Sequence, residues 1–129
     1  MIRLSFALAV LLTAVATYAC ATSPSTVSES YTGALETRSV FSRIFIVGKA
    51  GTVKLTLTSL APPSQQIGLG LGTPGVGLSC DLNVTVKATG TAAAQLASQV
   101  NPGRYCFEVY DLGTLTDAVS FTLLIEHPR

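Results

Sequence analysis

Apolar and polar side chains alternate with a period of two along residues 52–58, 104–110 and 119–125. This period is typical of β-strands that are buried on one face and exposed on the other. We expect the apolar faces to pack between two sheets. The side chains on these faces are Val53, Leu55, Leu57, Tyr105, Phe107, Val109, Phe121, Leu123 and Ile125.

Further strands are predicted at residues 31–35, 40–47, 67–72 and 80–87. Every second residue of the stretch 67–72 is glycine, which indicates either a weakly ordered strand or close approach of another backbone. In the stretch 80–87 one face, predicted to point inward, carries four residues. These are Cys80, Leu82, Val84 and Val86.

Residues 91–100 suit either a short alanine-rich helix or an extended segment. The strands on both sides need a partner, so we predict a strand here. About eight short strands separated by turn signals predict an all-β protein built as an antiparallel β-sandwich or barrel.

The first 19 residues have the pattern of an export signal, with Arg3 ahead of an apolar run. That run is shorter than the ~20 apolar residues of a membrane span. The alternative is an uncleaved N-terminal anchor helix. Residues 20–30 are rich in serine and threonine and predict a flexible tether, which leaves residues 31–129 as a single domain.

Cys20 lies where the apolar run ends and resembles the lipidated cysteine of bacterial lipoproteins. The match is incomplete, because such sites favour leucine and a small residue where Thr17 and Tyr18 stand. Ordinary cleavage and secretion is the alternative. Lipidation of Cys20 would attach the protein to a membrane and would explain why one of the three cysteines has no partner.

The other two cysteines, Cys80 and Cys106, are expected to form a disulfide, because an exported chain enters an oxidising compartment. Their strand phases conflict, since Cys80 is in register with inward residues and Cys106 is not. Either Cys80 precedes its strand, in the loop at residues 77–79, or a β-bulge shifts one phase. We favour the loop.

Two segments and the C-terminal strand resemble the pre-peptidase C-terminal domains of bacteria. They are residues 51–58, the Gly-x-Tyr strand at residues 102–111, and residues 121–128, and the likeness covers residues 31–128. The resemblance implies a jelly-roll-like β-sandwich in an exported protein. It also implies, by analogy with relatives, binding of an extracellular polymer.

Charge and composition exclude several functions. Without Arg3, the basic residues equal the seven acidic ones, so no basic stripe suggests a nucleic-acid partner. The only histidine, His127, stands near the C-terminus, where we expect it to be solvated and unsuited to a catalytic triad or zinc site. A Gly-x-Gly-x-x-Gly pattern beginning at Gly70 lacks the helix that a dinucleotide site requires. No metal or other cofactor is expected.

Two weaker candidates for binding remain. Carboxylates could meet at one end of the sandwich and bind calcium, although solvated turn residues are the simpler interpretation. These carboxylates are Asp81, Glu108, Asp111 and Asp117. Sugar binding usually needs exposed aromatic rings, and only Tyr31 and Tyr110 qualify.

We therefore expect a non-enzymatic exported binding or accessory module, as a lipoprotein of the cell envelope or as a secreted or periplasmic protein. Its expected partner is an extracellular polymer or an envelope protein. The alternative is a structural subunit of a larger envelope or extracellular assembly.

Overall fold

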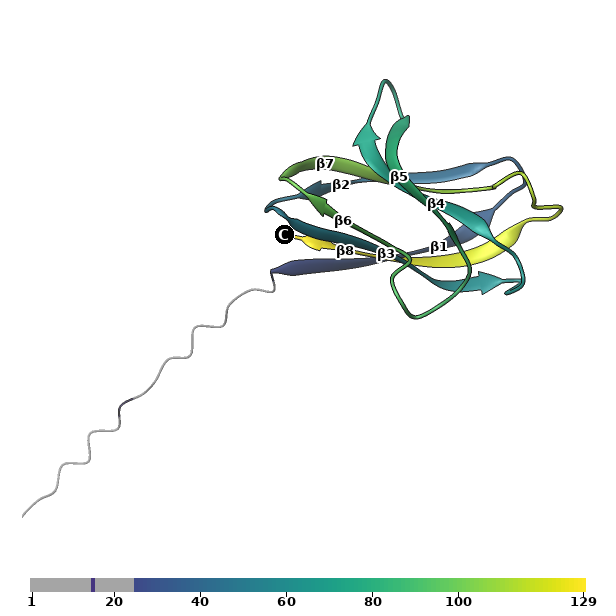
Figure 1. Cartoon of the computed structure of the whole chain (residues 1–129), viewed down its shortest axis with the longest axis horizontal. Helices are drawn as coiled ribbons and strands as arrows, with labels where there is room; N and C mark the ends of the chain where they lie inside the picture. Colours follow the sequence, from purple (N-terminus) through teal and green to yellow (C-terminus); the bar gives the residue numbers. More distant parts are fainter. Residues whose placement is uncertain (1–14, 16–24) are drawn as a thin grey trace, which may run out of the picture.

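The computed structural model describes residue 15 and residues 25–129, and it is all-β in these residues (Figure 1). Within this part of the chain, no helix is long and apolar enough to cross a membrane. The signal segment 1–19, apart from residue 15, and the proposed lipidation site Cys20 lie outside the described residues. The eight strands are β1 (Thr26–Leu35), β2 (Val40–Val47), β3 (Gly51–Ala61), β4 (Ile67–Pro74), β5 (Cys80–Ala88), β6 (Leu96–Val100), β7 (Gly103–Tyr110) and β8 (Val119–Pro128).

Two four-stranded antiparallel sheets face each other. Sheet A has the order β1-β8-β3-β6 and sheet B the order β2-β7-β4-β5. The first strand pairs with the last, the second with the seventh, and so on inward to β4 and β5. This is the strand order of a jelly roll, a rolled hairpin whose innermost turn joins β4 to β5. The predicted sandwich fold is confirmed.

Strand β1 begins five residues before the predicted start, so the predicted tether is too long at its C-terminal end. Thr26 to Ser30 pair with Pro128 to Leu124 of β8. The serines and threonines suggested a loop, but the long C-terminal strand supplies them with backbone partners. The nonlocal pairing therefore overrides the local composition.

The strand predicted in the segment 91–100 is present in its second half only, and residues 91–95 form bends and no helix. The preceding Gln95 is hydrogen-bonded instead to the bulged part of β3, where the register with β8 shifts between Leu57 and Ser59. Its side-chain oxygen accepts from the backbone N–H of Leu57 at 2.7 Å, and its side-chain nitrogen donates to the carbonyl oxygen of Leu57 at 3.3 Å. The glutamine thus completes backbone hydrogen bonding at the bulge.

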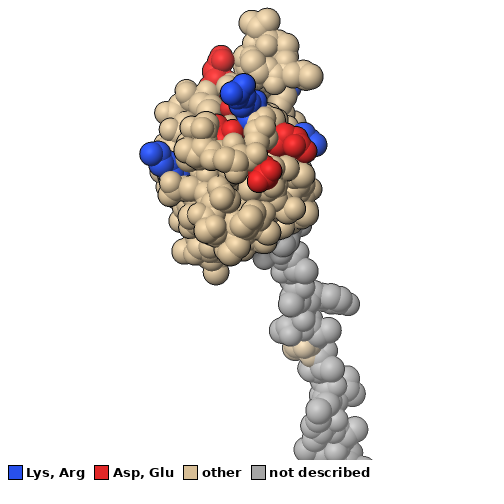
Figure 2. Space-filling model, turned by 90° about the vertical axis from the view of Figure 1, so that its right-hand side faces the viewer, with Lys and Arg blue, Asp and Glu red and all other residues tan. Residues whose placement is uncertain are grey.

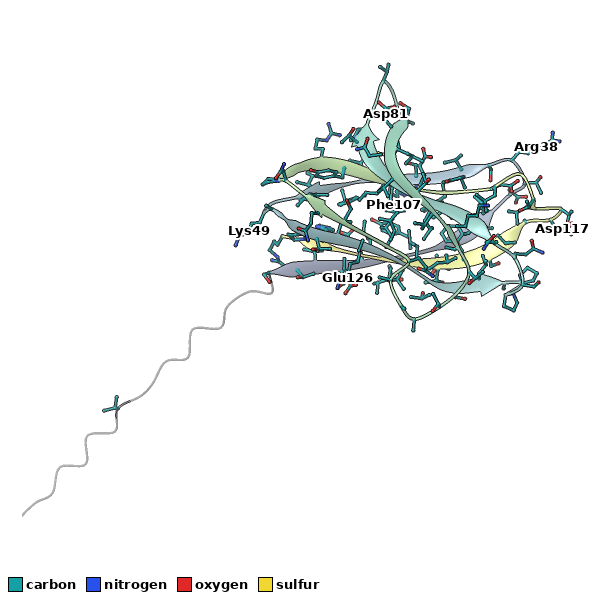
Figure 3. All side chains as sticks on the ribbon, in the orientation of Figure 1. Arg38, Lys49, Asp81, Phe107, Asp117 and Glu126 are labelled. Carbon is teal, nitrogen blue, oxygen red and sulfur yellow. A yellow bond between two sulfur atoms is a disulfide. The ribbon has the colours of Figure 1, made fainter. Side chains whose placement is uncertain are left out.

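The apolar faces meet between the sheets as the alternation predicted. Eight of the nine predicted side chains are buried, and Tyr105 is half-buried against them. Phe107 lies at the centre of the sandwich (Figure 3), within 5.2 Å of the ring of Tyr31 and 6.4 Å of that of Phe45, measured between ring centroids. Such aromatic contacts add to the stabilisation from burial alone.

A β-bulge in β5 reverses the predicted phase of its first half. Leu71 pairs with Val84 but the next residue, Gly72, pairs with Leu82, so Asn83 is the extra residue. Val84 and Val86 pack against the core, as predicted. Leu82 instead lies over Gly70 on the outer face, so the prediction that Leu82 points inward was wrong.

The disulfide between Cys80 and Cys106 is present. Cys80 is the first residue of β5 and not a loop residue, so the bulge, not the favoured loop position, resolves the conflict of phases. The two cysteines lie on strands separated by β4, yet their Cα atoms are 5.9 Å apart. In a flat sheet, the Cα atoms of two strands separated by a third lie about 9.5 Å apart. The start of β5 therefore bends over β4.

The glycines of β4 make this crossing possible. A Cβ atom at Gly72 would collide with the backbone of Asp81, and one at Gly68 would collide with the ring of Tyr110. Close approach, one of the two predicted explanations for the alternating glycines, is therefore correct. The disulfide closes a loop with a sequence separation of 26, for which chain entropy predicts about 3.5 kcal/mol of stabilisation.

Replacing Phe107 by alanine should lower the free energy of unfolding by about 3–5 kcal/mol, because it leaves a cavity at the centre of the core. Urea denaturation followed by tyrosine fluorescence measures this. Ile46→Ala, at a side chain that is 68% exposed, should cost less than about 0.5 kcal/mol. Equal effects of the two substitutions would contradict the assigned strand phase.

Gly72→Ala should lower the free energy of unfolding by at least about 2 kcal/mol, because the backbone of Asp81 has no room to move away. Gly33→Ala is the matched control, since its Cβ would come no closer than 3.4 Å to the ring of Phe121. Mass spectrometry of non-reduced digests should also show less Cys80–Cys106 linkage in Gly72→Ala. Equal stability of the two variants would refute the crossing.

Candidate functional site

The outer faces of the two sheets differ in chemistry. Sheet A presents hydroxyl groups, such as Thr32 and Thr122, whose oxygen atoms lie 3.2 Å apart, and Thr58, which donates to the carbonyl oxygen of Thr122. Sheet B presents the glycine face of β4, covered in part by Tyr110 and Leu82. A polar face and a partly apolar face therefore lie on opposite sides of the molecule.

The strongly exposed, large apolar side chains of residues 25–129 all belong to the sheet B side. Val40, Ile44 and Ile46 lie on β2, the edge strand of sheet B, and point away from the core. Val76 and Leu78, which are 97% and 93% exposed, lie in the connection between β4 and β5. We call residues 75–79 the hairpin tip. It projects from the sandwich (Figure 1) and is uncharged.

The end of the sandwich below this projection carries scattered charges. Figure 2 shows Lys and Arg side chains interspersed with Asp and Glu, without an extended patch of either sign. A shallow, mostly apolar hollow of about 320 Å³ lies near this end. It is lined by Arg38, Ser39, Val40, Leu82, Glu108, Tyr110, Asp111 and Gly113.

Strands β2, β7 and β5 together position the side chains of the hollow. Val40 pairs with Tyr110 and therefore shares its outer face. Leu82 reaches the hollow because the bulge at Asn83 turns it outward. Glu108 lies between Cys106 and Tyr110 on the outer face of β7, directly opposite Gly70. The hollow thus combines apolar side chains with two carboxylates, those of Glu108 and Asp111, and with Arg38.

Burial raises the pKa of Glu108 above its ordinary value. Burial is the only cause, so no hydrogen bond or neighbouring positive charge offsets it. Polar groups placed in partly apolar hollows at a cost in stability are typical of binding sites. Glu108 is therefore the residue that we consider first as a binding group on this face.

Asp111 has a structural role instead. One carboxylate oxygen accepts from the backbone N–H of Gly113 at 2.8 Å and also from those of the next two residues. The other oxygen accepts from the backbone N–H of Arg38 at 2.8 Å. These bonds, that of Arg38 foremost, hold the pKa of Asp111 below its ordinary value. Asp111 therefore fastens the loop after β7 to the loop before β2.

The four carboxylates considered for calcium do not meet at one site, although Glu108 and Asp111 line the same hollow. Asp81 lies at the projecting hairpin, whereas Asp117 lies at the end of the sandwich near Arg38 (Figure 3). Nowhere in residues 25–129 do three His, Cys, Asp or Glu side chains form a group suited to a metal ion. The Gly-x-Gly-x-x-Gly pattern lies in β4 and the turn after it, with no helix following.

Of the two tyrosines considered for sugar binding, only Tyr110 lies on an outer face. Tyr31 is half-buried against the core, and its ring centroid is 5.2 Å from that of Phe107. Its hydroxyl donates to Glu29 at 2.8 Å, and burial, followed by this bond, raises its pKa. Tyr31 is thus a core residue and not a platform for a sugar.

The prediction that His127 is solvated was wrong, because the ring is only 4% exposed. It lies 5.0 Å from the ring of Phe45, measured between centroids, and its Nδ1 atom is 2.9 Å from the carbonyl oxygen of Pro128. The alternation of β8 continues through Ile125 to His127, and this signal could have identified the residue as inward-facing. The sequence-based prediction placed His127 in solvent because the residue stands near the C-terminus.

The sequence pattern did not predict the hollow. Glu108 and Tyr110 were considered separately, for calcium and for sugars, and Leu82 was assigned to the core. The glycines of β4 were the available signal, because they indicated that other groups lie against that face. Which groups these are depends on the bulge at Asn83, which the alternation in residues 80–87 does not reveal.

Glu108→Gln should raise the stability of the protein at pH 7. The raised pKa means that the ionised carboxylate destabilises the folded state, so the contribution of Glu108 is fully present below pH 4.5 and is lost as the pH rises through the raised pKa. The glutamine side chain of the variant does not ionise, so this loss of stability does not occur. Thermal unfolding should show a higher Tm for the variant at pH 7 and no difference below pH 4.5. A lower Tm at pH 7 would contradict this assignment.

Comparisons with known proteins assign no family to the chain. No family model matches it, and neither the curated proteins nor the solved structures include a match. The resemblance to pre-peptidase C-terminal domains therefore rests on the residues of the three segments alone.

Proposed function

We propose that the protein is an exported, non-enzymatic binding module that resembles pre-peptidase C-terminal domains and is held at the cell envelope by a lipid on Cys20. Its sheet B side binds an extracellular polymer or an envelope protein. The observation that carries this proposal is the one-sided distribution of exposed apolar side chains.

Single exposed apolar residues are common on protein surfaces, but gathered ones indicate interaction sites. Here Ile44 and Ile46 on β2 and Val76 and Leu78 at the hairpin tip share the side of sheet B. The hydroxyl-rich outer face of sheet A offers no comparable group. A ligand that covers the sheet B side would remove these side chains from water and gain from the hydrophobic effect.

A role without catalysis is supported by the position of the only histidine. The His127 ring is buried between strands, and its Nε2 atom has no hydrogen-bond partner within residues 25–129. It therefore cannot act as a general base toward a substrate at the surface. Its contact with Phe45 is that of a core side chain.

Attachment to the envelope is supported by the sequence pattern around Cys20 and by the place where the chain enters the sandwich. Strand β1 begins at the end of the sandwich that carries Lys49, opposite the end that carries Arg38 and Asp117 (Figure 3). A lipid on Cys20 would leave the hollow, which Arg38 lines, at the end remote from the anchor. The Cys80–Cys106 disulfide is compatible with an oxidising compartment.

A structural subunit of a larger assembly is the second candidate, and strand β2 favours it. This strand is eight residues long, lies at the edge of sheet B and is apolar on its outer face. Such an edge accepts a strand from another chain. Discrete oligomers of the purified protein would favour this candidate over a monomeric binding module.

The test is cosedimentation of the purified protein with the insoluble cell-wall fraction of the producing cells, washed with mild detergent to remove attachment through lipid. The wild type should pellet with this fraction. Val76→Ser combined with Leu78→Ser should reduce the bound amount at least tenfold, because both side chains are exposed in the free protein and available for contact.

The matched control is Lys54→Ser combined with Ala97→Ser. These two residues pair with each other on sheet A and are exposed, so the control should bind like the wild type. The proposal fails if the wild type stays in solution, or if both double variants lose binding equally.

A further inference from the structure

The hollow on sheet B is lined by a carboxylate, that of Glu108, to which no group of residues 25–129 donates a hydrogen bond. Glu108 has no ion pair within residues 25–129, and its pKa is raised by burial alone. The other carboxylate of the hollow, Asp111, already accepts four backbone hydrogen bonds. Glu108 is therefore the acceptor in the hollow that remains available to a ligand.

The surroundings of Glu108 are mostly hydrocarbon. The side chains of Val40, Leu82 and Tyr110 line the same hollow. They keep their positions because Tyr110 lies against Gly68 and Leu82 against Gly70, where larger residues would displace them. A rigid, partly apolar wall around one carboxylate suits a cation that itself carries carbon atoms.

A metal ion fits this hollow poorly. Calcium takes six to eight oxygen ligands, and the hollow offers one carboxylate that is not already committed to backbone groups. An organic ammonium group needs only one counter-charge, and its attached carbon atoms gain from contact with apolar and aromatic side chains. The volume of about 320 Å³ is enough for such a group.

We propose that this hollow binds an aliphatic ammonium group of the ligand, with Glu108 as its counter-charge and with Val40, Leu82 and Tyr110 in contact with the carbon atoms beside the nitrogen. This inference rests on the proposed binding function and names the chemistry that the ligand must carry. Arg38 also lines the hollow, and its backbone N–H donates a hydrogen bond to Asp111.

The test is a titration of the isotope-labelled full-length protein with butylammonium chloride, followed by the amide resonances in NMR spectra. Resonances of β7 and of the start of β5 should shift in a saturable way. Butan-1-ol, the neutral molecule of similar shape, should bind at least tenfold more weakly. Glu108→Gln should weaken butylammonium binding at least tenfold, and its spectrum reports whether the variant is folded.

Glu126→Gln is the matched control, because Glu126 is also a half-buried strand glutamate but lies on the outer face of sheet A. It should bind butylammonium like the wild type. Tighter binding of a capped lysine than of butylammonium would support the proposal and assign the ammonium group to a peptide. Equal affinities for the capped lysine and for butylammonium would also support the proposal, and would show that the hollow does not recognise a peptide backbone.

Three results would overturn the proposal: no saturable shift at the hollow, equal affinity for butanol, or unchanged affinity in Glu108→Gln. None of them bears on cosedimentation through the hairpin tip. Conversely, if the wild type fails to cosediment, the proposed binding function is refuted. The ammonium titration would still show by its own result whether the hollow binds an ammonium group. The two failures are thus distinguishable.

Discussion

The start of β5 crosses over the glycine face of β4, and the shape of the sheet B side depends on this close contact. At Gly72 the backbone of Asp81 occupies the place of a side chain, and the Cys80–Cys106 disulfide fastens this arrangement to β7. The bulge at Asn83 restores the inward phase of Val84 and Val86 while leaving Leu82 outside. The hollow and the projecting hairpin tip both follow from this crossing.

The buried faces of the two sheets are alike, whereas their outer faces differ in chemistry. The buried faces, with Phe107 at their centre, supply the hydrophobic stabilisation that holds the sheets together. Sheet A satisfies its outer hydroxyl groups among themselves and with backbone carbonyls. The sheet B side instead exposes apolar groups and keeps a carboxylate, Glu108, in a position that raises its pKa.

Where the sequence-based predictions failed, nonlocal contacts outweighed local patterns. Serines and threonines before Tyr31 suggested a tether, yet β8 is long enough to pair with residues from Thr26 onward. His127 was assigned to solvent because of its place near the C-terminus, yet it continues the inward face of β8 beneath Phe45. In both cases the partner strand or ring comes from a distant part of the chain.

The amino-acid sequence alone determined the all-β class, the inward phase of Leu55, Phe107 and Leu123, and the pairing of Cys80 with Cys106. These follow from a period of two and from cysteine number, which are local or compositional properties. Only the tertiary structure decided which face Cys80 and Leu82 occupy and which groups surround Glu108. A single extra residue in β5 inverts every side chain on one side of it. Periodicity cannot locate that residue here, because Leu82 and Val84 are both apolar although they lie on opposite faces of the sheet.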